Sequence, residues 1–238
     1  MSEQFSSDPE IQKWLDGQFL LLKKPLGWTS FDLVRKVRYS ICKYCGIKKI
    51  KVGHAGTLDP LASGLMILCT GKATKKLFTF QDLGKEYVAG FRFGATTPSF
   101  DLETEIDKTF PVDHITLDKI KEVAAGFVGP QMQIPPIFSA KRIEGKRAYN
   151  YARDGETAEM QKQAIEIKSI EVIDFLLPDV KLRVSCSKGT YIRALARDMG
   201  LALGSGGHLY SLSRTKIGSY SLDNAQSVED FEKSLQLV

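Results

Sequence analysis

The most informative stretch of the chain is Gly53–Gly64, which reads GHAGTLDPLASG. Its glycines permit tight backbone geometry, and Pro60 biases Asp59 away from helical dihedral angles. The apolar run Leu65–Cys69 follows and predicts a buried strand. The pattern therefore places a carboxylate on an irregular loop beside a buried strand, a common location for functional side chains. On local physics alone, the more common role of an Asp-Pro pair is to start an Asx turn or a β-turn.

Patterns on either side of this stretch predict an α+β fold with a mixed, largely antiparallel sheet flanked by helices and loops. Period-2 alternation or short apolar runs predict strands near 19–22, 65–69, 85–93, 164–175, 179–186 and 208–212. Apolar faces at helical spacing predict helices over 30–45, 72–80, 116–126, 146–153 and 190–203, and a short one from 227. In the helix from 190, Arg193 and Arg197 are expected on the side opposite the core.

The length of 238 residues suits one catalytic domain spanning 1–238. Residues 1–16 are expected to be a mobile lead-in. The Pro-rich segment and basic helix of about 130–155 are expected to form a clamp on RNA. About 25 residues follow the last motif, too few for a separate C-terminal RNA-binding domain.

The composition argues against a membrane protein, a secreted protein and a metal-binding protein. No apolar run reaches the roughly 18 residues that span a membrane, and the polar start lacks the order of a signal peptide. The four cysteines include one C-x-x-C at Cys42 and Cys45, without a second pair or suitably spaced histidines. We therefore expect a cytoplasmic protein with reduced thiols and no metal site.

Charge is segregated along the chain. Residues 23–51 hold nine basic side chains against Asp32 alone, whereas residues 98–122 hold seven acids against three lysines. Such segregation indicates a polyanion-binding face or, equally well, ordinary solvated surfaces. Charge alone does not decide between the two.

Gly53–Gly64, continued by GKATK at 71–75, closely resembles the signature of TruB-type tRNA pseudouridine synthases. Further blocks in the same order resemble the family's other motifs, and together they cover roughly residues 19–222. These blocks are KPLGWTS at 24–30, KEY at 85–87, GATT at 94–97, IPP at 134–136, SAK at 139–141, YAR at 151–153, CSKGTYIR at 186–193 and HLYSLSR at 208–214. The resemblance implies the pseudouridine synthase fold and isomerisation of uridine 55 in the T-loop of tRNA, with no cofactor.

The resemblance also implies roles for single residues. It makes Asp59 the nucleophile, Arg193 its ion-pair partner and Tyr87 the ring that stacks on the flipped base. His54 fills the space that the base leaves, while Tyr191 and Leu212 line the pocket. Candidate phosphate contacts are Lys24, Lys72, Lys141, Arg153 and Lys188.

Plainer interpretations stay open for these residues. By spacing alone Tyr87 would pack beside Phe91 and Phe93 in a strand, and Arg193 could pair with Asp198 at the surface. Each phosphate candidate could instead be an ordinary surface cation. The chain also departs from the family pattern, with Lys23 where an acid usually precedes Lys-Pro, and Pro98 where an acid usually follows the threonine.

Three functions remain to be distinguished. A stand-alone tRNA-modifying enzyme, acting on the T-arm as a monomer without protein partners or a membrane, is favoured. A non-catalytic RNA-binding module would explain the basic segments, but not Asp59, Tyr87 and Arg193 in matching motifs. An RNA-guided synthase within a ribonucleoprotein would keep the chemistry and change the substrate. Nucleotide-binding loops are excluded, because Ala73 follows Lys72 where a phosphate-binding loop needs Ser or Thr.

Overall fold

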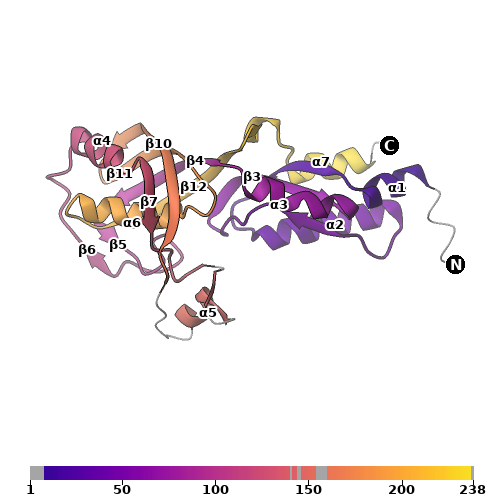
Figure 1. Cartoon of the computed structure of the whole chain (residues 1–238), viewed down its shortest axis with the longest axis horizontal. Helices are drawn as coiled ribbons and strands as arrows, with labels where there is room; N and C mark the ends of the chain where they lie inside the picture. The colour runs from indigo at the N-terminus through magenta and orange to yellow at the C-terminus, as the bar shows by residue number, and fades with distance from the viewer. Residues whose placement is uncertain (1–7, 140, 144–145, 154–159, 237–238) are drawn as a thin grey trace. The chain divides into compact units, whose positions relative to one another are not determined.

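The computed structural model describes residues 8–139, 141–143, 146–153 and 160–236. The chain forms two compact units, a division that the sequence did not indicate. The first contains the residues up to Lys85 and those from Ser213 onward, and the second runs from Glu86 to Leu212 (Figure 1). Strands follow the hydrogen-bonded order β1-β3-β12-β4-β11-β10-β7, with β2 and β13 off this path. This mixed, largely antiparallel sheet confirms the predicted α+β fold.

The strands of the first unit centre on β3 (Ala62–Thr70). β1 (Phe19–Lys24) pairs antiparallel with it, with Lys24 opposite Gly64. β2 (Val52–His54) pairs with its other end, with His54 opposite Leu68. The C-terminal part of β12 (Gly207–Ile217) and β13 (Tyr220–Ser221) complete this part of the sheet. The strands therefore fix both ends of the loop that carries Asp59.

An apolar core cluster of the first unit includes residues on both sides of this loop in sequence, Ala55 and Leu65. Leu65, Ile67 and Ile217 are fully buried, and Ala55 packs in the same cluster. Aromatic side chains at its edge, Phe80 and Tyr220, lie with their ring centroids 6.0 Å apart. They come from α3 (Leu77–Gln81), which follows the 3-10 helix η2 (Gly71–Lys76), and from β13.

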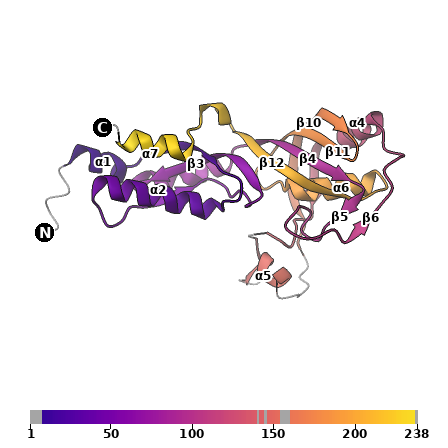
Figure 2. The ribbon, with the colours of Figure 1, turned by 180° about the vertical axis from the view of Figure 1, so that it is seen from behind.

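Helix α2 (Ser30–Cys45) begins and ends where its sequence signals predict. Thr29 and Asp32 form a reciprocal capping box at the start, and Gly46 takes the left-handed conformation at the end. Its buried apolar face includes Leu33, Val34, Val37 and Ile41. Helix α7 (Val228–Gln236) lies along α2, as Figures 1 and 2 both show.

Residues 1–16 were expected to be a mobile lead-in, and for residues 9–16 this expectation is wrong. They form helix α1 (Pro9–Asp16), which Asp8 caps and Pro9 starts. Ile11 and Trp14 are buried, and Trp14 meets Phe231 of α7 edge-to-face at 6.2 Å between ring centroids. The burial of these two side chains stabilises a helix too short to persist alone in water.

The second unit is built on long antiparallel strands. β10 (Gln163–Leu176) pairs with β11 (Asp179–Cys186) on one side and with β7 (Gly129–Gln133) on the other. β4 (Lys85–Phe93) runs next to the N-terminal part of β12, as expected from its alternating pattern. Short pairs join β5 (Ala95–Thr96) to β6 (Lys108–Thr109), and β8 (Arg142–Ile143) to β9 (Lys146–Arg147).

Three helices lie in the described residues of this unit. α4 (Leu117–Gly126) packs against β10 and against α6 (Ile192–Ala202). α5 (Ala148–Arg153) follows β9 and lies within the segment expected to clamp RNA. Residues 140, 144–145 and 154–155 of that segment lie outside the described residues. A 3-10 turn, η3 (Leu222–Asn224), belongs to the first unit.

Candidate active site

The loop that carries Asp59 is held on both sides of this residue. The hydroxyl of Ser30 accepts a hydrogen bond from the Leu58 amide at 2.8 Å and donates one to the Leu58 carbonyl at 3.0 Å. The amide of Gly27 donates to the Pro60 carbonyl at 2.8 Å. Each neighbour of Asp59 is therefore tied to the KPLGWTS segment, which explains why the two motifs occur together.

A third tie comes from Arg214 on β12, whose side chain is 1% exposed. Its Nε donates to the Leu65 carbonyl at 2.8 Å, its Nη2 to the Gly56 carbonyl at 3.2 Å and its Nη1 to the Thr57 carbonyl at 3.4 Å. The same guanidinium thus reaches backbone on both sides of Asp59 in sequence.

Lys24, which the sequence offered as a phosphate contact or an ordinary surface cation, is buried in the structure. Its side chain is 1% exposed, and Nζ donates to the carbonyls of Pro25 and Trp28. Burial lowers the pKa of Lys24 to about 8, while the charge of Asp59 opposes the shift and the charge of Arg214 adds to it. Lys24, Asp59 and Arg214 are therefore close enough to interact electrostatically.

His54 ends β2 close to the same charges. Burial lowers the pKa of His54 below its ordinary value, and the positive charge of Arg214 adds to the shift. Its Nδ1 is buried and has no hydrogen-bond partner among the described residues. Burial therefore favours the neutral form of the ring.

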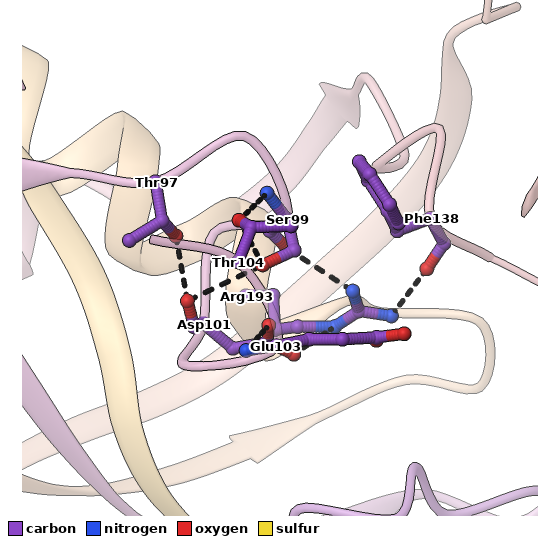
Figure 3. A network of polar contacts seen from close by, with 7 residues as sticks. All are labelled: Thr97, Ser99, Asp101, Glu103, Thr104, Phe138 and Arg193. Carbon is purple, nitrogen blue, oxygen red and sulfur yellow. Dashed lines mark hydrogen bonds and ion pairs between the residues drawn. The ribbon is translucent and has the colours of Figure 1, made fainter. Parts of the chain in front are cut away.

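In the second unit, Arg193 is the centre of a buried polar network (Figure 3). Its guanidinium donates to the Phe138 carbonyl at 2.7 Å and to the Ser99 carbonyl at 3.1 Å. Its Nε lies 3.5 Å from a carboxylate oxygen of Asp101. With 4% of its surface exposed, Arg193 is buried, which corrects its expected position opposite the core.

The turn that contains Asp101 is rigidly built. Thr97 and Ser99 donate their hydroxyl hydrogens to the Asp101 carbonyl at 2.6 and 3.2 Å, and Ser99 also bonds to Thr104 (Figure 3). The Asp101 carboxylate accepts from the Glu103 amide at 3.0 Å. Phe100 has a φ of 62° in this turn, and the guanidinium of Arg197 lies 4.8 Å from its ring centroid. The turn therefore presents the Ser99 carbonyl and the Asp101 carboxylate to Arg193 in a fixed geometry.

The backbone of Tyr191 is fixed from β7. The side-chain amide of Gln133 accepts from the Tyr191 amide at 2.9 Å and donates to the Tyr191 carbonyl at 3.1 Å. This pair of bonds orients the first turn of α6, from which Arg193 projects. Lys141 donates to the side chain of Gln163 at 3.2 Å, and Gln163 donates to the Gly189 carbonyl at 2.6 Å.

The remaining predicted site residues fall in both units. Tyr87 is buried in β4, Leu212 is half-buried in β12, and Lys188 is exposed in the turn before α6. Lys72 is exposed and lies 2.7 Å from a carboxylate oxygen of Asp16. Arg153 is the last residue of α5. The first unit contains Lys24, His54, Asp59 and Lys72; the second contains Tyr87, Lys141, Arg153, Lys188, Tyr191, Arg193 and Leu212.

Sequence reasoning missed three residues of this arrangement. Ser30 and Arg214 lie inside the quoted motif blocks and Asp101 lies just after one of them, which is the signal that could have identified them. Asp101 comes three residues after Pro98, the position at which the family pattern usually has an acid. Its carboxylate is the one that Arg193 contacts. Along the described stretches no helix is both long and apolar enough to cross a membrane.

Comparison with known proteins identifies the family of the chain. Residues 43–192 match the model of the TruB family pseudouridylate synthase N-terminal domain, and residues 193–238 match that of the tRNA pseudouridylate synthase B C-terminal domain. The chain is 56% identical to tRNA pseudouridine synthase B of Phocaeicola vulgatus, over 92% of this chain and 94% of the relative. It is 51% identical to the protein of that name from Flavobacterium johnsoniae, over 94% of this chain and 99% of the relative.

A solved structure shares the fold. It is an H/ACA ribonucleoprotein bound to a substrate RNA containing 2'-deoxyuridine, with a TM-score of 0.66 and 27% identity. The match covers 96% of this chain but 56% of that one, so the chain spans little more than half of its length. The family models and the curated relatives together define the assignment: the chain belongs to the TruB family of pseudouridylate synthases and is an isomerase that acts on tRNA.

Proposed function

We propose that this protein isomerises uridine 55 in the T-loop of tRNA to pseudouridine, with Asp59 as the nucleophile. The reaction breaks the bond between N1 and C1′, turns the base and forms a bond between C5 and C1′. One proton leaves C5 and one is gained at N1, so that product and substrate have the same atoms. This balance needs no redox partner, nucleotide or metal ion.

The single observation that carries the proposal is the way in which the Asp59 loop is held. Ser30 fixes Leu58, Gly27 fixes Pro60, and Arg214 fixes Gly56 and Thr57. A nucleophile held in one geometry gains much of its rate from orientation alone. The charge of Asp59 also acts on the buried ammonium of Lys24, so these two groups lie close enough to interact.

Arg193 and Tyr87 keep, within this proposal, the roles that the family resemblance gives them. Arg193 is the ion-pair partner of Asp59, and Tyr87 stacks on the extruded base. The burial of the Arg193 guanidinium supports an electrostatic role, since charges act more strongly on one another where water is excluded. The protein works as a stand-alone monomer in the cytoplasm, with His54, Tyr191 and Leu212 around the base.

The test is to incubate the purified protein with unmodified tRNA transcript, without cofactor or magnesium, and to map pseudouridine by base-specific chemistry. The parent should modify the T-loop uridine, and Asp59→Asn should not, while it binds the same tRNA. Arg193→Met should lower the single-turnover rate with little change in Kd. Arg183→Met, which removes only an exposed pair with Glu171, is the matched arginine control.

The outcomes separate the alternatives. Tight tRNA binding without turnover would indicate an RNA-binding module. Turnover that requires an added guide RNA would indicate a ribonucleoprotein enzyme. Turnover by Asp59→Asn at the parental rate would remove Asp59 from the mechanism, and an unchanged rate in Arg193→Met would remove Arg193.

A further inference from the structure

Arg214 is a buried cation, 1% exposed. No carboxylate lies within ion-pair distance of it along the described chain, and its three hydrogen bonds all go to backbone carbonyls. A buried charge without an opposite charge is costly. The fold keeps this guanidinium nevertheless, and it does so at the loop that carries Asp59.

The three carbonyls are not equivalent in sequence. Gly56 and Thr57 come two to three residues before Asp59, whereas Leu65 comes after the loop has returned to β3. A planar guanidinium with donors in fixed directions can bridge such points at once, which a lysine ammonium on a flexible stem cannot do with the same geometry. Arg214 therefore spans the loop at its base.

Gly64 lies directly against the backbone of Arg214. Gly64 has a φ of 113°, and a Cβ added there would lie 2.4 Å from the Arg214 carbonyl oxygen. Lys24 lies opposite Gly64 in the β1–β3 ladder. The backbones of β3 and β12 thus approach closely at the residue from which the guanidinium projects, so its direction is set by the sheet.

We propose that Arg214 is a positioning residue for the reaction, one that holds the Asp59 loop in its reactive geometry without touching the substrate. The role rests on the proposed function of Asp59. Together with Ser30 and Gly27, Arg214 restricts the backbone on both sides of the nucleophile. Its loss frees the 56–57 carbonyls and allows Asp59 to sample other positions, while the surfaces that contact tRNA stay as they are.

The test compares Arg214→Met and Arg214→Lys with the parent at a temperature well below their melting temperatures. Single-turnover rate and tRNA Kd are measured separately. Arg214→Met should lower the rate on the order of 10²-fold, the scale of a small misplacement of reacting groups, with Kd within about threefold of the parent. Arg214→Lys should recover part of the rate, because it keeps the charge and loses the bridging geometry.

A destabilised control separates positioning from general loss of stability. Phe231→Leu on α7 removes buried aromatic surface elsewhere in the same unit, and it should melt earlier while it keeps the parental rate. Amide hydrogen exchange should accelerate at 56–62 in Arg214→Met and stay unchanged there in Phe231→Leu.

The two proposals fail in different ways. A parental rate in Arg214→Met, with Asp59→Asn inactive, overturns the positioning role and leaves the nucleophile in place. Equal losses of rate in Arg214→Met and Phe231→Leu also overturn it, because stability alone would then explain the effect. Turnover by Asp59→Asn would overturn the proposed function itself.

Discussion

The guanidinium of Arg193 lies 3.5 Å from the carboxylate of Asp101, and the two side chains are 4% and 6% exposed. Ninety-two positions separate these residues in the sequence, yet they form a buried ion pair within one compact unit. Because the pair is shielded from water, it is weakly screened by salt. Asp101 thereby fixes the orientation of the arginine that the reaction uses in the proposed function.

Asp101→Asn should lower both stability and turnover. The change removes an opposite charge from a buried guanidinium, which costs roughly 3 kcal/mol in unfolding free energy. The exposed pair of Arg183 and Glu171 provides the control: Glu171→Gln should cost less than about 1 kcal/mol. Urea unfolding and single-turnover rates of both variants measure the two effects. Parental stability in Asp101→Asn would show that Arg193 does not need this carboxylate.

Lys24 should make stability depend on pH in an alkaline window. Its folded pKa of about 8 lies below the ordinary value of 10.5, so the unfolded chain holds this proton more tightly. The contribution of Lys24 to stability is therefore full above about pH 10.5 and is lost as the pH falls to about 8. One proton changes the unfolding free energy by at most about 1.4 kcal/mol per pH unit.

The measurement is the unfolding free energy of parent and Lys24→Met at pH 7.5, 8.5 and 9.5. The parent should gain stability relative to the variant as the pH rises. Lys23→Met, which removes the exposed neighbouring charge, should follow the parent in this window. Parallel curves for parent and Lys24→Met would mean that Lys24 titrates alike in folded and unfolded chains.

Local sequence signals predicted helix boundaries such as those of α2. They did not predict which charged side chains would be buried. Thr29, Asp32 and Gly46 mark the ends of α2 because caps depend on residues next to them in sequence. Local signals of the same kind mark α1, in the cap Asp8, in Pro9 and in the spacing of its apolar residues.

Helix spacing predicted Arg193 on the side opposite the core, and the sequence left Lys24 as a phosphate contact or an ordinary surface cation. Lys24 donates to backbone carbonyls, and Arg193 pairs with Asp101. These contacts exist only after the chain has folded. The carbonyl contacts of Arg214 are likewise invisible in sequence, since a backbone carbonyl has no residue type that could mark it. Lys24, Arg193 and Arg214 all lie within the family motifs, but the motifs do not indicate which contacts these residues make.

Exposed lysines next to β2 should contribute to tRNA binding without affecting the chemical step. Lys48 and Lys49 are exposed in the loop before β2, within the basic segment 23–51. Replacing both by Gln should weaken tRNA binding and reduce the salt dependence of Kd, by up to about 0.9 in the log–log slope for each phosphate that a lysine no longer neutralises. The rate at saturating tRNA should stay unchanged.

The matched control replaces Lys119 and Lys121 by Gln. These are two exposed lysines on α4, in a segment that contains several acids. This double variant should leave both Kd and the salt slope at parental values. Filter binding from 50 to 200 mM salt measures the slopes. Equal slopes for the parent and the Lys48/Lys49 variant would assign these lysines to an ordinary solvated surface.

Gly64→Ala should test how closely β3 and β12 must approach beneath the Asp59 loop. Two effects act at this position: a φ of 113°, which alanine rarely adopts, and a Cβ that would lie 2.4 Å from the Arg214 carbonyl oxygen. At Gly46 only the first kind of effect operates, because φ is 63° and no atom lies within 4 Å of an added Cβ. Gly46→Ala should therefore cost about 1 kcal/mol, and Gly64→Ala distinctly more. Turnover should fall in Gly64→Ala and be retained in Gly46→Ala, since the clash in the former displaces the backbone from which Arg214 reaches the loop. If the two variants lost equal stability and both kept their rate, the close approach at Gly64 would have no bearing on the geometry of Asp59.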